Sequence, residues 1–347
     1  MSAGQYPLEI RKDDPEAILL FSRVRLSRNL EGHRFWPVAS LSEQDATFME
    51  LESFRARFFP QLSLLADASS PRKPLELLAE RLEIPTSLCT RSGGVWSAFQ
   101  EEGGQRGLFL NDEDHLRLWA RRPGCDLLAC LEDVSDWEAL AREHLSLARD
   151  AHWGWKTWNP AILGSGLQGM VSVFLPALRW TRRLSQVREG LDAVGFFLQP
   201  LSDVEDEDIA LQAIGNRIAL GATEAELAAR LEELALRLRE EERRALEDLV
   251  QEREAELRDA VFRSDALLGA CSLLSREESL RRLELCALGG RLGWIPEGRA
   301  ALAAFLHLAT GKAHLEDMAG AVANEAHPQL DDLRASAVVK AWKAGAG

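Results

Sequence analysis

The most restrictive feature of the sequence is a long helical pattern in its last third. Residues 224–258 are rich in Ala, Leu, Glu and Arg, and leucines recur at positions 227, 231, 234 and 238. This spacing predicts one long amphipathic helix, which can extend to Val261. Thr223 and Glu226 have the spacing of a capping box and predict where the helix starts. Its apolar stripe indicates a contact with the protein core or with a second copy of the chain, and not a chemical site.

The rest of the chain combines strand and helix patterns. Patterns typical of strands occur at residues 17–28, 95–99, 106–110, 195–201 and 209–220, and the second and third form a hairpin. Patterns typical of helices occur at residues 41–83 (with a break at 70–74), 133–151, 275–287, 297–310 and 331–342. The sequence therefore predicts an α+β part over residues 1–260 and an all-helical part over residues 261–347.

Composition excludes several classes of protein. No run of about 18 apolar residues is present, so no membrane span is predicted, and residues 1–12 do not form a secretory signal. The five cysteines are scattered without a CxxC pair, which favours a reducing, cytoplasmic location over a zinc site or disulfides. The net charge of −14 argues against nucleic-acid binding. An acidic surface can attract arginine-rich partners, although solubility alone also explains it.

Three segments have residue types suited to phosphate chemistry. In residues 21–30 (F-S-R-V-R-L-S-R-N-L), Arg23 and Arg25 alternate on a strand and share a face that could clamp a polyphosphate. An exposed basic strand would look the same. Residues 110–117 (L-N-D-E-D-H-L-R) place acidic groups before Arg117, which suits a cation and a phosphate together, but also suits a solvated loop or a helix N-terminus.

The third segment is a glycine-containing loop before an apolar strand. Residues 154–167 contain Gly164 and Gly166, and an apolar run follows at 171–178. Glycines here could let the backbone approach a phosphate, or could form an ordinary tight turn.

Together these segments resemble the motifs of the ATP:guanidino phosphotransferases. That family has, in this order, S-x-R-x-R, N-E-E-D-H-L-R and T-x-C-P-x-x-x-G-x-G motifs. Residues 79–81 and 214–221 resemble two further family segments, so the resemblance spans roughly residues 18–342. It implies a guanidino-kinase catalytic domain, with an antiparallel sheet flanked by helices.

The bacterial protein-arginine kinases within this family fit best. Only about twenty residues precede the first motif, where creatine and arginine kinases have a longer helical domain. The C-terminal helices resemble the dimerisation and substrate-binding domain of the protein-arginine kinases. Asp331 and Arg334 match part of their phosphoarginine-binding R-D-x-x-R-A motif, although its first arginine is replaced by Leu330. The resemblance implies binding to a protein that bears arginine or phosphoarginine, and either a homodimer or a heterodimer with a related kinase.

The resemblance also implies a reaction and its residues. The family transfers the γ-phosphoryl group of ATP, bound with Mg, to a guanidinium nitrogen. Glu113 occupies the position of the carboxylate that orients the guanidinium and takes its proton. The nucleotide-side positions are those of Ser22, Arg23, Arg25 and Arg117.

Several family positions are changed in this sequence. Asn159 replaces the loop cysteine and has no negative charge, and Gln168 replaces a phosphate-binding arginine. A further arginine near residues 198–201 has no counterpart, Asp203 is the best candidate for a second carboxylate, and Leu82 replaces an adenine-side histidine. Losing two phosphate arginines would cost about 3–6 kcal/mol of phosphate binding.

Two functions follow from this pattern. The substitutions favour a catalytically impaired pseudokinase that acts by binding a protein arginine, a phosphoarginine or a kinase partner. The retained residues support the alternative of a divergent, active protein-arginine kinase. The sequence thus leaves enzymatic activity open, and a kinase for small guanidino compounds is disfavoured.

Overall fold

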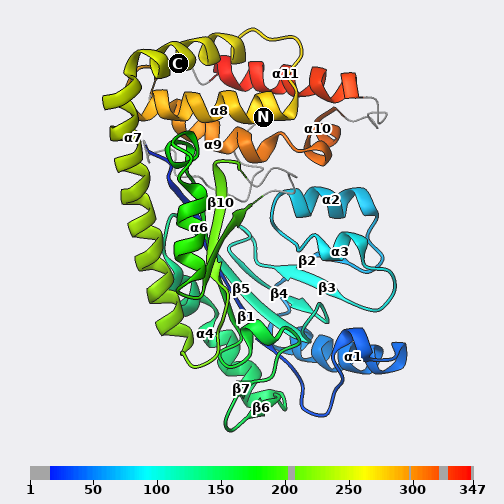
Figure 1. Cartoon of the computed structure of the whole chain (residues 1–347). Helices are drawn as coiled ribbons and strands as arrows, with labels where there is room; N and C mark the ends of the chain where they lie inside the picture. Colours follow the sequence, from blue (N-terminus) through cyan, green and yellow to red (C-terminus); the bar gives the residue numbers. More distant parts are fainter. Residues whose placement is uncertain (1–15, 202–207, 297, 320–326, 345–347) are drawn as a thin grey trace.

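The computed structural model describes residues 16–201, 208–296, 298–319 and 327–344, and it is built around one eight-stranded sheet (Figure 1). Every neighbouring pair of strands in the sheet is antiparallel. In spatial order the strands are β2 (Ser63–Asp67), β3 (Ser97–Gln100), β4 (Arg106–Leu110), β5 (Leu116–Pro123), β1 (Leu19–Arg28), β8 (Leu167–Phe174), β10 (Leu211–Asn216) and β9 (Phe196–Pro200). A separate small sheet pairs β6 (Arg149–Asp150) with β7 (Gly154–Trp155).

Helices cover the sheet and continue beyond it. Those of the sheet-containing part are α1 (Leu41–Phe58), α2 (Arg72–Glu80), α3 (Ser87–Thr90), α4 (Leu127–His144), α5 (Pro176–Trp180) and α6 (Leu184–Asp192). Two short 3-10 helices are η1 (Trp36–Val38) and η2 (Pro160–Ile162). The long helix α7 (Glu224–Leu268) leads to α8 (Arg276–Arg291), α9 (Gly298–Ala309), α10 (Lys312–Ala319) and α11 (His327–Ala344). The α+β fold followed by a helical C-terminal region is therefore confirmed.

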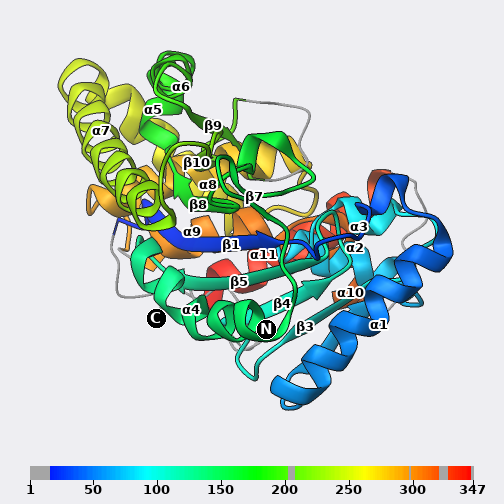
Figure 2. The same ribbon diagram turned by 90° about the horizontal axis from the view of Figure 1, so that it is seen from below.

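One face of the central strands is closed by α4 and α7. Helix α4 packs on β1 and β5, while α7 packs on β8, β10 and α4. The apolar stripe of α7 is buried there, as at Leu227, Leu231 and Leu238. Figure 2 shows α7 and α1 on opposite sides of the molecule. The apolar stripe therefore belongs to the core, and α7 covers one face of the sheet.

The C-terminal helices form a layer at one end of the sheet (Figure 1). Helix α8 packs against α7 and α9, and α10 reaches back to contact α2. None of the helices in the described ranges is long and apolar enough to cross a membrane.

The expected hairpin, the strands and the capping box of Thr223 are confirmed. Other expectations were wrong in detail. Strand β2 lies inside the region predicted as helical, because a short apolar run does not distinguish a strand from a helix. Helix α4 begins and ends earlier than 133–151, and α10 was not predicted. Helix α7 runs through residue 260 with a kink at Arg253, and the proposed domain boundary there stays a prediction.

Candidate functional site: an arginine-lined pocket

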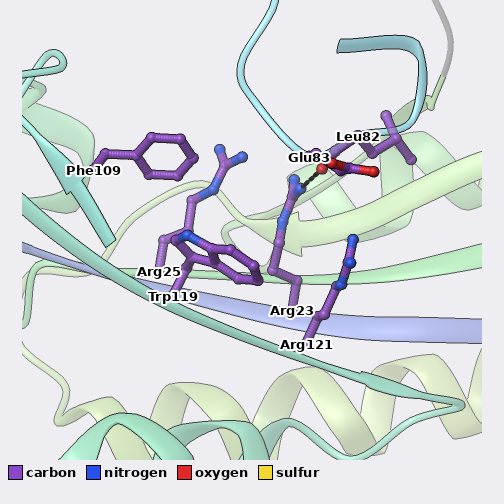
Figure 3. Close-up of a pocket in the computed structure, with 7 residues that line it drawn as sticks. All are labelled: Arg23, Arg25, Leu82, Glu83, Phe109, Trp119 and Arg121. Carbon is purple, nitrogen blue, oxygen red and sulfur yellow. Dashed lines mark hydrogen bonds between the residues drawn. The ribbon is translucent and has the colours of Figure 1, made fainter. Parts of the chain in front are cut away.

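Arginines from two neighbouring strands share the sheet face opposite α4. Arg23 on β1 is directly opposite Arg121 on β5, and Arg25 is opposite Trp119. Side chains alternate along a strand and cross-strand partners point the same way, so Arg117 also lies on this face. Figure 3 shows the side chains of Arg23, Arg25 and Arg121 gathered in one pocket. Arg23 and Arg25 therefore lie on the same face of the sheet, as the sequence predicts.

The pocket is small and has an aromatic wall. Phe109 and Trp119 line it beside the arginines, and Leu82 and Glu83 from the loop after α2 close it (Figure 3). It has about 200 Å³ of empty space, part of which is open to solvent.

The arginines of the pocket lack ion pairs within the part of the chain that the structure describes. Within the described ranges, Arg23, Arg25 and Arg121 form no ion pair with a carboxylate. Burial lowers the pKa of Arg23, with further lowering by the charges of Arg25 and Arg121. Burial and the charge of Arg117 lower the pKa of Arg25 to about 10. All three remain cationic at neutral pH, and clustered cations of this kind attract an anion.

Unused hydrogen-bond donors show where such an anion fits. Arg25 Nε, Arg117 Nε and Arg121 Nη2 are buried and have no hydrogen-bond partner among the described residues. Buried donors are normally satisfied, and phosphate oxygens are strong acceptors for guanidinium groups. The phosphates of the nucleotide implied by the family resemblance therefore fit the residues present.

Arg23 also holds the loop that closes the pocket. Its Nη1 donates to the carbonyl oxygen of Leu82 at 2.9 Å. Leu82 has a φ of 59°, a left-handed conformation that is costly for a residue with a side chain. The bond from Arg23 stabilises this turn and so connects the end of α2 to the arginines of the pocket.

Arg117 is held by the acidic segment that precedes it. Its Nη1 lies 2.5 Å from Asp112 Oδ2, and its Nη2 lies 3.3 Å from Glu113 Oε2 and 3.7 Å from Asp114 Oδ2. Although burial opposes the charged form, these carboxylates raise the pKa of Arg117. Asp112 and Asp114 are 1% exposed, whereas the Glu113 side chain is 45% exposed. The segment is therefore not a solvated loop, and Glu113 is its accessible carboxylate.

Asp114 joins the three sequence motifs. Its Oδ1 accepts hydrogen bonds from Asn29 Nδ2 and from the backbone N–H of Trp158, both at 2.8 Å. Asn29 directly follows β1, and Trp158 belongs to the glycine-containing loop. Because this carboxylate is buried, it fixes the relative positions of the loop, the arginine strand and Glu113.

The glycine-containing loop uses its special residues for its own packing. Asn159 Oδ1 accepts from the N–H of Ala161 at 3.0 Å and caps η2. A Cβ on Gly166, whose φ is +68°, would lie 2.6 Å from Arg28 Nη1 and from the carbonyl oxygen of Ser27. Glycine is therefore required there by the close approach of the loop to β1. Gln168 follows on β8 and is directly opposite Arg25.

Other predicted residues lie outside the pocket. Ser22 alternates with Arg23, so its hydroxyl lies on the α4 side of β1, where it accepts from the N–H of Asp126 at 3.0 Å. Arg334 on α11 is buried, and its Nη1 donates to the carbonyl oxygen of Leu274 at 2.9 Å and to Asp331 Oδ1 at 2.7 Å. Asp203 lies outside the described residues. The roles predicted for Asp331, Arg334 and Asp203 stay predictions.

Several pocket residues were missed by sequence reasoning. Trp119 and Arg121 follow Arg117 at intervals of two residues on β5, so all three side chains lie on one face. This alternation could have predicted them, but the family motif ends at Arg117. Phe109 and Glu83 come from other segments, and no local pattern places them here. Within the described residues there is no group of three or more His, Cys, Asp or Glu side chains arranged to hold a metal ion.

Two family models match adjoining parts of the chain. Residues 87–245 match the ATP:guanido phosphotransferase C-terminal catalytic domain, and residues 254–344 match the protein-arginine kinase McsB C-terminal domain. The protein-arginine kinase of Halothermothrix orenii is 29% identical over 325 residues, which are 93% of this chain and 92% of that protein. The protein-arginine kinase of Bacillus subtilis is 28% identical over 338 residues, which are 95% of this chain and 92% of that protein.

Solved structures show the same fold at lower identity. The duplicated taurocyamine kinase from Schistosoma mansoni superposes with a TM-score of 0.58 at 17% identity, covering 77% of this chain and 38% of that duplicated chain. Lombricine kinase superposes with a TM-score of 0.54 at 16% identity, covering 66% of this chain and 67% of that chain. At these identities the likeness concerns the fold alone.

Proposed function

Because the chain is a homologue of the protein-arginine kinases in the ATP:guanido phosphotransferase family, we propose that it phosphorylates arginine side chains of proteins. The observation that carries this proposal is that Arg23 and Arg25, which form no ion pair within the described residues, lie on the sheet face of Arg117. Arg117 in turn contacts Glu113, an accessible carboxylate. A phosphoryl donor needs the first feature, and a guanidinium acceptor needs the second.

We assign each residue a role from its position on the sheet. Arg23 and Arg25 hold the phosphates of the nucleotide through charge-assisted hydrogen bonds. Arg117, fixed by two buried aspartates, stabilises the charge that develops during transfer. Glu113 orients the acceptor guanidinium and takes its proton. Bound Mg-ATP supplies the γ-phosphoryl group, and catalysis consists mainly of alignment and charge stabilisation.

Binding without catalysis is the second candidate function. Asn159 stands at the position of the family's loop cysteine, and its side-chain oxygen is engaged by the N–H of Ala161. Gln168 faces Arg25 at a position where the family has an arginine. Neither side chain has a charge, so both substitutions favour a slower enzyme or a protein that only binds arginine or phosphoarginine.

The test is phosphotransfer from labelled ATP to an arginine-containing protein, with phosphoarginine detected by mass spectrometry. We expect the Glu113→Gln variant to lose about 10²–10⁴-fold in rate, because it cannot accept the proton. Glu143→Gln, which changes an exposed carboxylate on α4, is the matched control and should retain the wild-type rate.

The outcomes separate the two candidates. Phosphoarginine formed by the wild type and lost in the Glu113→Gln variant supports the kinase. Calorimetric binding of phosphoarginine without any phosphotransfer contradicts the kinase and supports the binding function. A Glu113→Gln variant as fast as the wild type would remove Glu113 from the proposed mechanism.

A further inference from the structure

Arg121 is a buried cation that the family motifs do not include. It is 6% exposed, lies directly opposite Arg23 across β5 and β1, and lines the same pocket (Figure 3). Its backbone N–H donates to the carbonyl oxygen of Gln105, and its Nε donates to that of Gly104 at 2.6 Å. These contacts leave Nη2 buried without a protein partner.

The hairpin turn between β3 and β4 is shaped around this guanidinium. Gly104 has a φ of +62°, and a Cβ built on it would lie 2.9 Å from Arg121 Nη2. A side chain at position 104 would therefore crowd the free edge of the guanidinium as well as strain the backbone. The turn therefore anchors Arg121 and leaves room for its Nη2.

The described residues give this charge no ion pair. Within the described residues Arg121 has no ion pair, and the nearest acidic influence is Glu83, whose pKa is raised by burial. The Trp119 ring lies 5.6 Å from the guanidinium carbon, a cation–π contact that brings no negative charge to the site. A buried cation is costly unless an anion compensates it, so the described site is suited to an anionic group of a ligand.

The order of residues along β5 indicates which part of the ligand Arg121 meets. Arg117 contacts Glu113, and Arg121 lies four residues further along the strand, about 13 Å away at the strand rise. We propose that Arg121 is an additional phosphate-binding residue, which holds the phosphate of the nucleotide that is farthest from Glu113. This rests on the nucleotide-binding part of the proposed function, and it adds a cation to the sheet face on which Gln168, opposite Arg25, stands at a family arginine position.

The experiment is calorimetric titration of the full chain with Mg-ADP and, separately, with inorganic tripolyphosphate. The variant is Arg121→Gln, and the matched control is Arg122→Gln, the next residue on the same strand. Arg122 faces away and pairs with Asp133 at 2.7 Å. We expect Arg121→Gln to weaken both ligands about 10–100-fold, the value of one hydrogen bond to a charged group, and Arg122→Gln to leave both unchanged.

Thermal unfolding without anions separates ligand binding from a structural role. Removal of an unpaired buried charge should leave the unfolding temperature near that of the wild type, whereas loss of a structural contact lowers it and spares affinity. If Arg121→Gln does not fold, Arg121→Lys keeps the charge and should bind with intermediate affinity.

Wild-type affinity of Arg121→Gln for both ligands overturns the proposal, as does a wild type that binds neither. Weakened binding of ADP with unchanged binding of tripolyphosphate also overturns it, because the contact would then be to the nucleoside. Phosphotransfer is not part of this measurement. A protein that binds nucleotide through Arg121 but phosphorylates nothing would refute the proposed kinase function and leave this inference intact.

Discussion

At the scale of single residues, three consecutive acidic side chains have three different surroundings. Asp112 is buried against Arg117, Asp114 is buried and joins the motifs, and Glu113 between them is accessible. Adjacent residues in an irregular segment point in different directions, so a cluster that looks uniform in sequence divides into two structural groups and one reactive group. This division gives a direct test of which carboxylates support the fold.

We expect the Asp112→Asn variant to lose about 3–5 kcal/mol of unfolding free energy, because it leaves the Arg117 charge buried without its main partner. Urea unfolding measures this loss. Asp133→Asn is the control, since it breaks the half-exposed pair with Arg122 and should cost about 1 kcal/mol or less. Equal losses in the two variants would contradict the assigned burial.

A second prediction at this scale concerns Asn159. If the protein is an arginine kinase, Asn159→Cys should raise its phosphotransfer rate about tenfold or more, because a thiolate beside the guanidinium stabilises its positive charge. Asn159→Ser is the matched control, since it also lacks the amide that caps η2 but forms no thiolate. An equal rate in both variants would show that the missing charge at this position does not limit catalysis.

At the scale of elements, a carboxylate links the C-terminal helices to the loop beside the pocket. Glu80, at the end of α2, accepts from the backbone N–H groups of Ala313 and His314 at the start of α10, both at 2.9 Å. Gly311 leaves room for it, because a Cβ there would lie 2.4 Å from Glu80 Oε2. Two residues after Glu80, Leu82 contacts Arg23, so α10 and the pocket share a short connection.

This contact has a pH dependence of known sign. Burial raises the pKa of Glu80 above its ordinary 4.5, although the two N–H groups oppose the shift. At pH values between the unfolded pKa of 4.5 and the raised pKa of the folded protein, the folded protein binds more protons than the unfolded chain. The stability that this group contributes therefore increases as the pH falls. We expect the unfolding free energy of the wild type, relative to Glu80→Gln, to increase as the pH falls from 7 to 4.5. A difference that is constant or decreases would contradict the burial of this carboxyl.

At the scale of the whole molecule, we expect the chain to form a dimer through its C-terminal helices. Phe262 on α7, Leu273 before α8 and Met318 on α10 are large apolar side chains left exposed in the single chain. Light scattering at micromolar concentration should report twice the monomer mass, and Phe262→Glu should shift it toward the monomer. Val38→Glu, at an exposed apolar residue of η1, is the control. A monomeric wild type would refute this expectation.

Local patterns predicted much of this architecture. Alternation placed Arg23 and Arg25 on one face, and the spacing of Thr223 and Glu226 marked the start of α7. Strand β2 was not predicted, because a segment of five residues is too short for its hydrophobic pattern to distinguish a strand from a helix. The assignments of Ser22 and Arg334 rested on resemblance, and the structure places both side chains in contacts outside the pocket.

The sequence by itself determined the fold class, the order of the motifs and the face on which each strand residue lies, because these depend on periodicities within a few residues. Only the tertiary structure decided that Leu82 and Glu83 close the pocket, that Arg121 joins Arg23, and that Glu80 caps α10. These contacts join residues far apart in the chain. Their burial and charge compensation depend on how the sheet and helices pack, which no local pattern encodes.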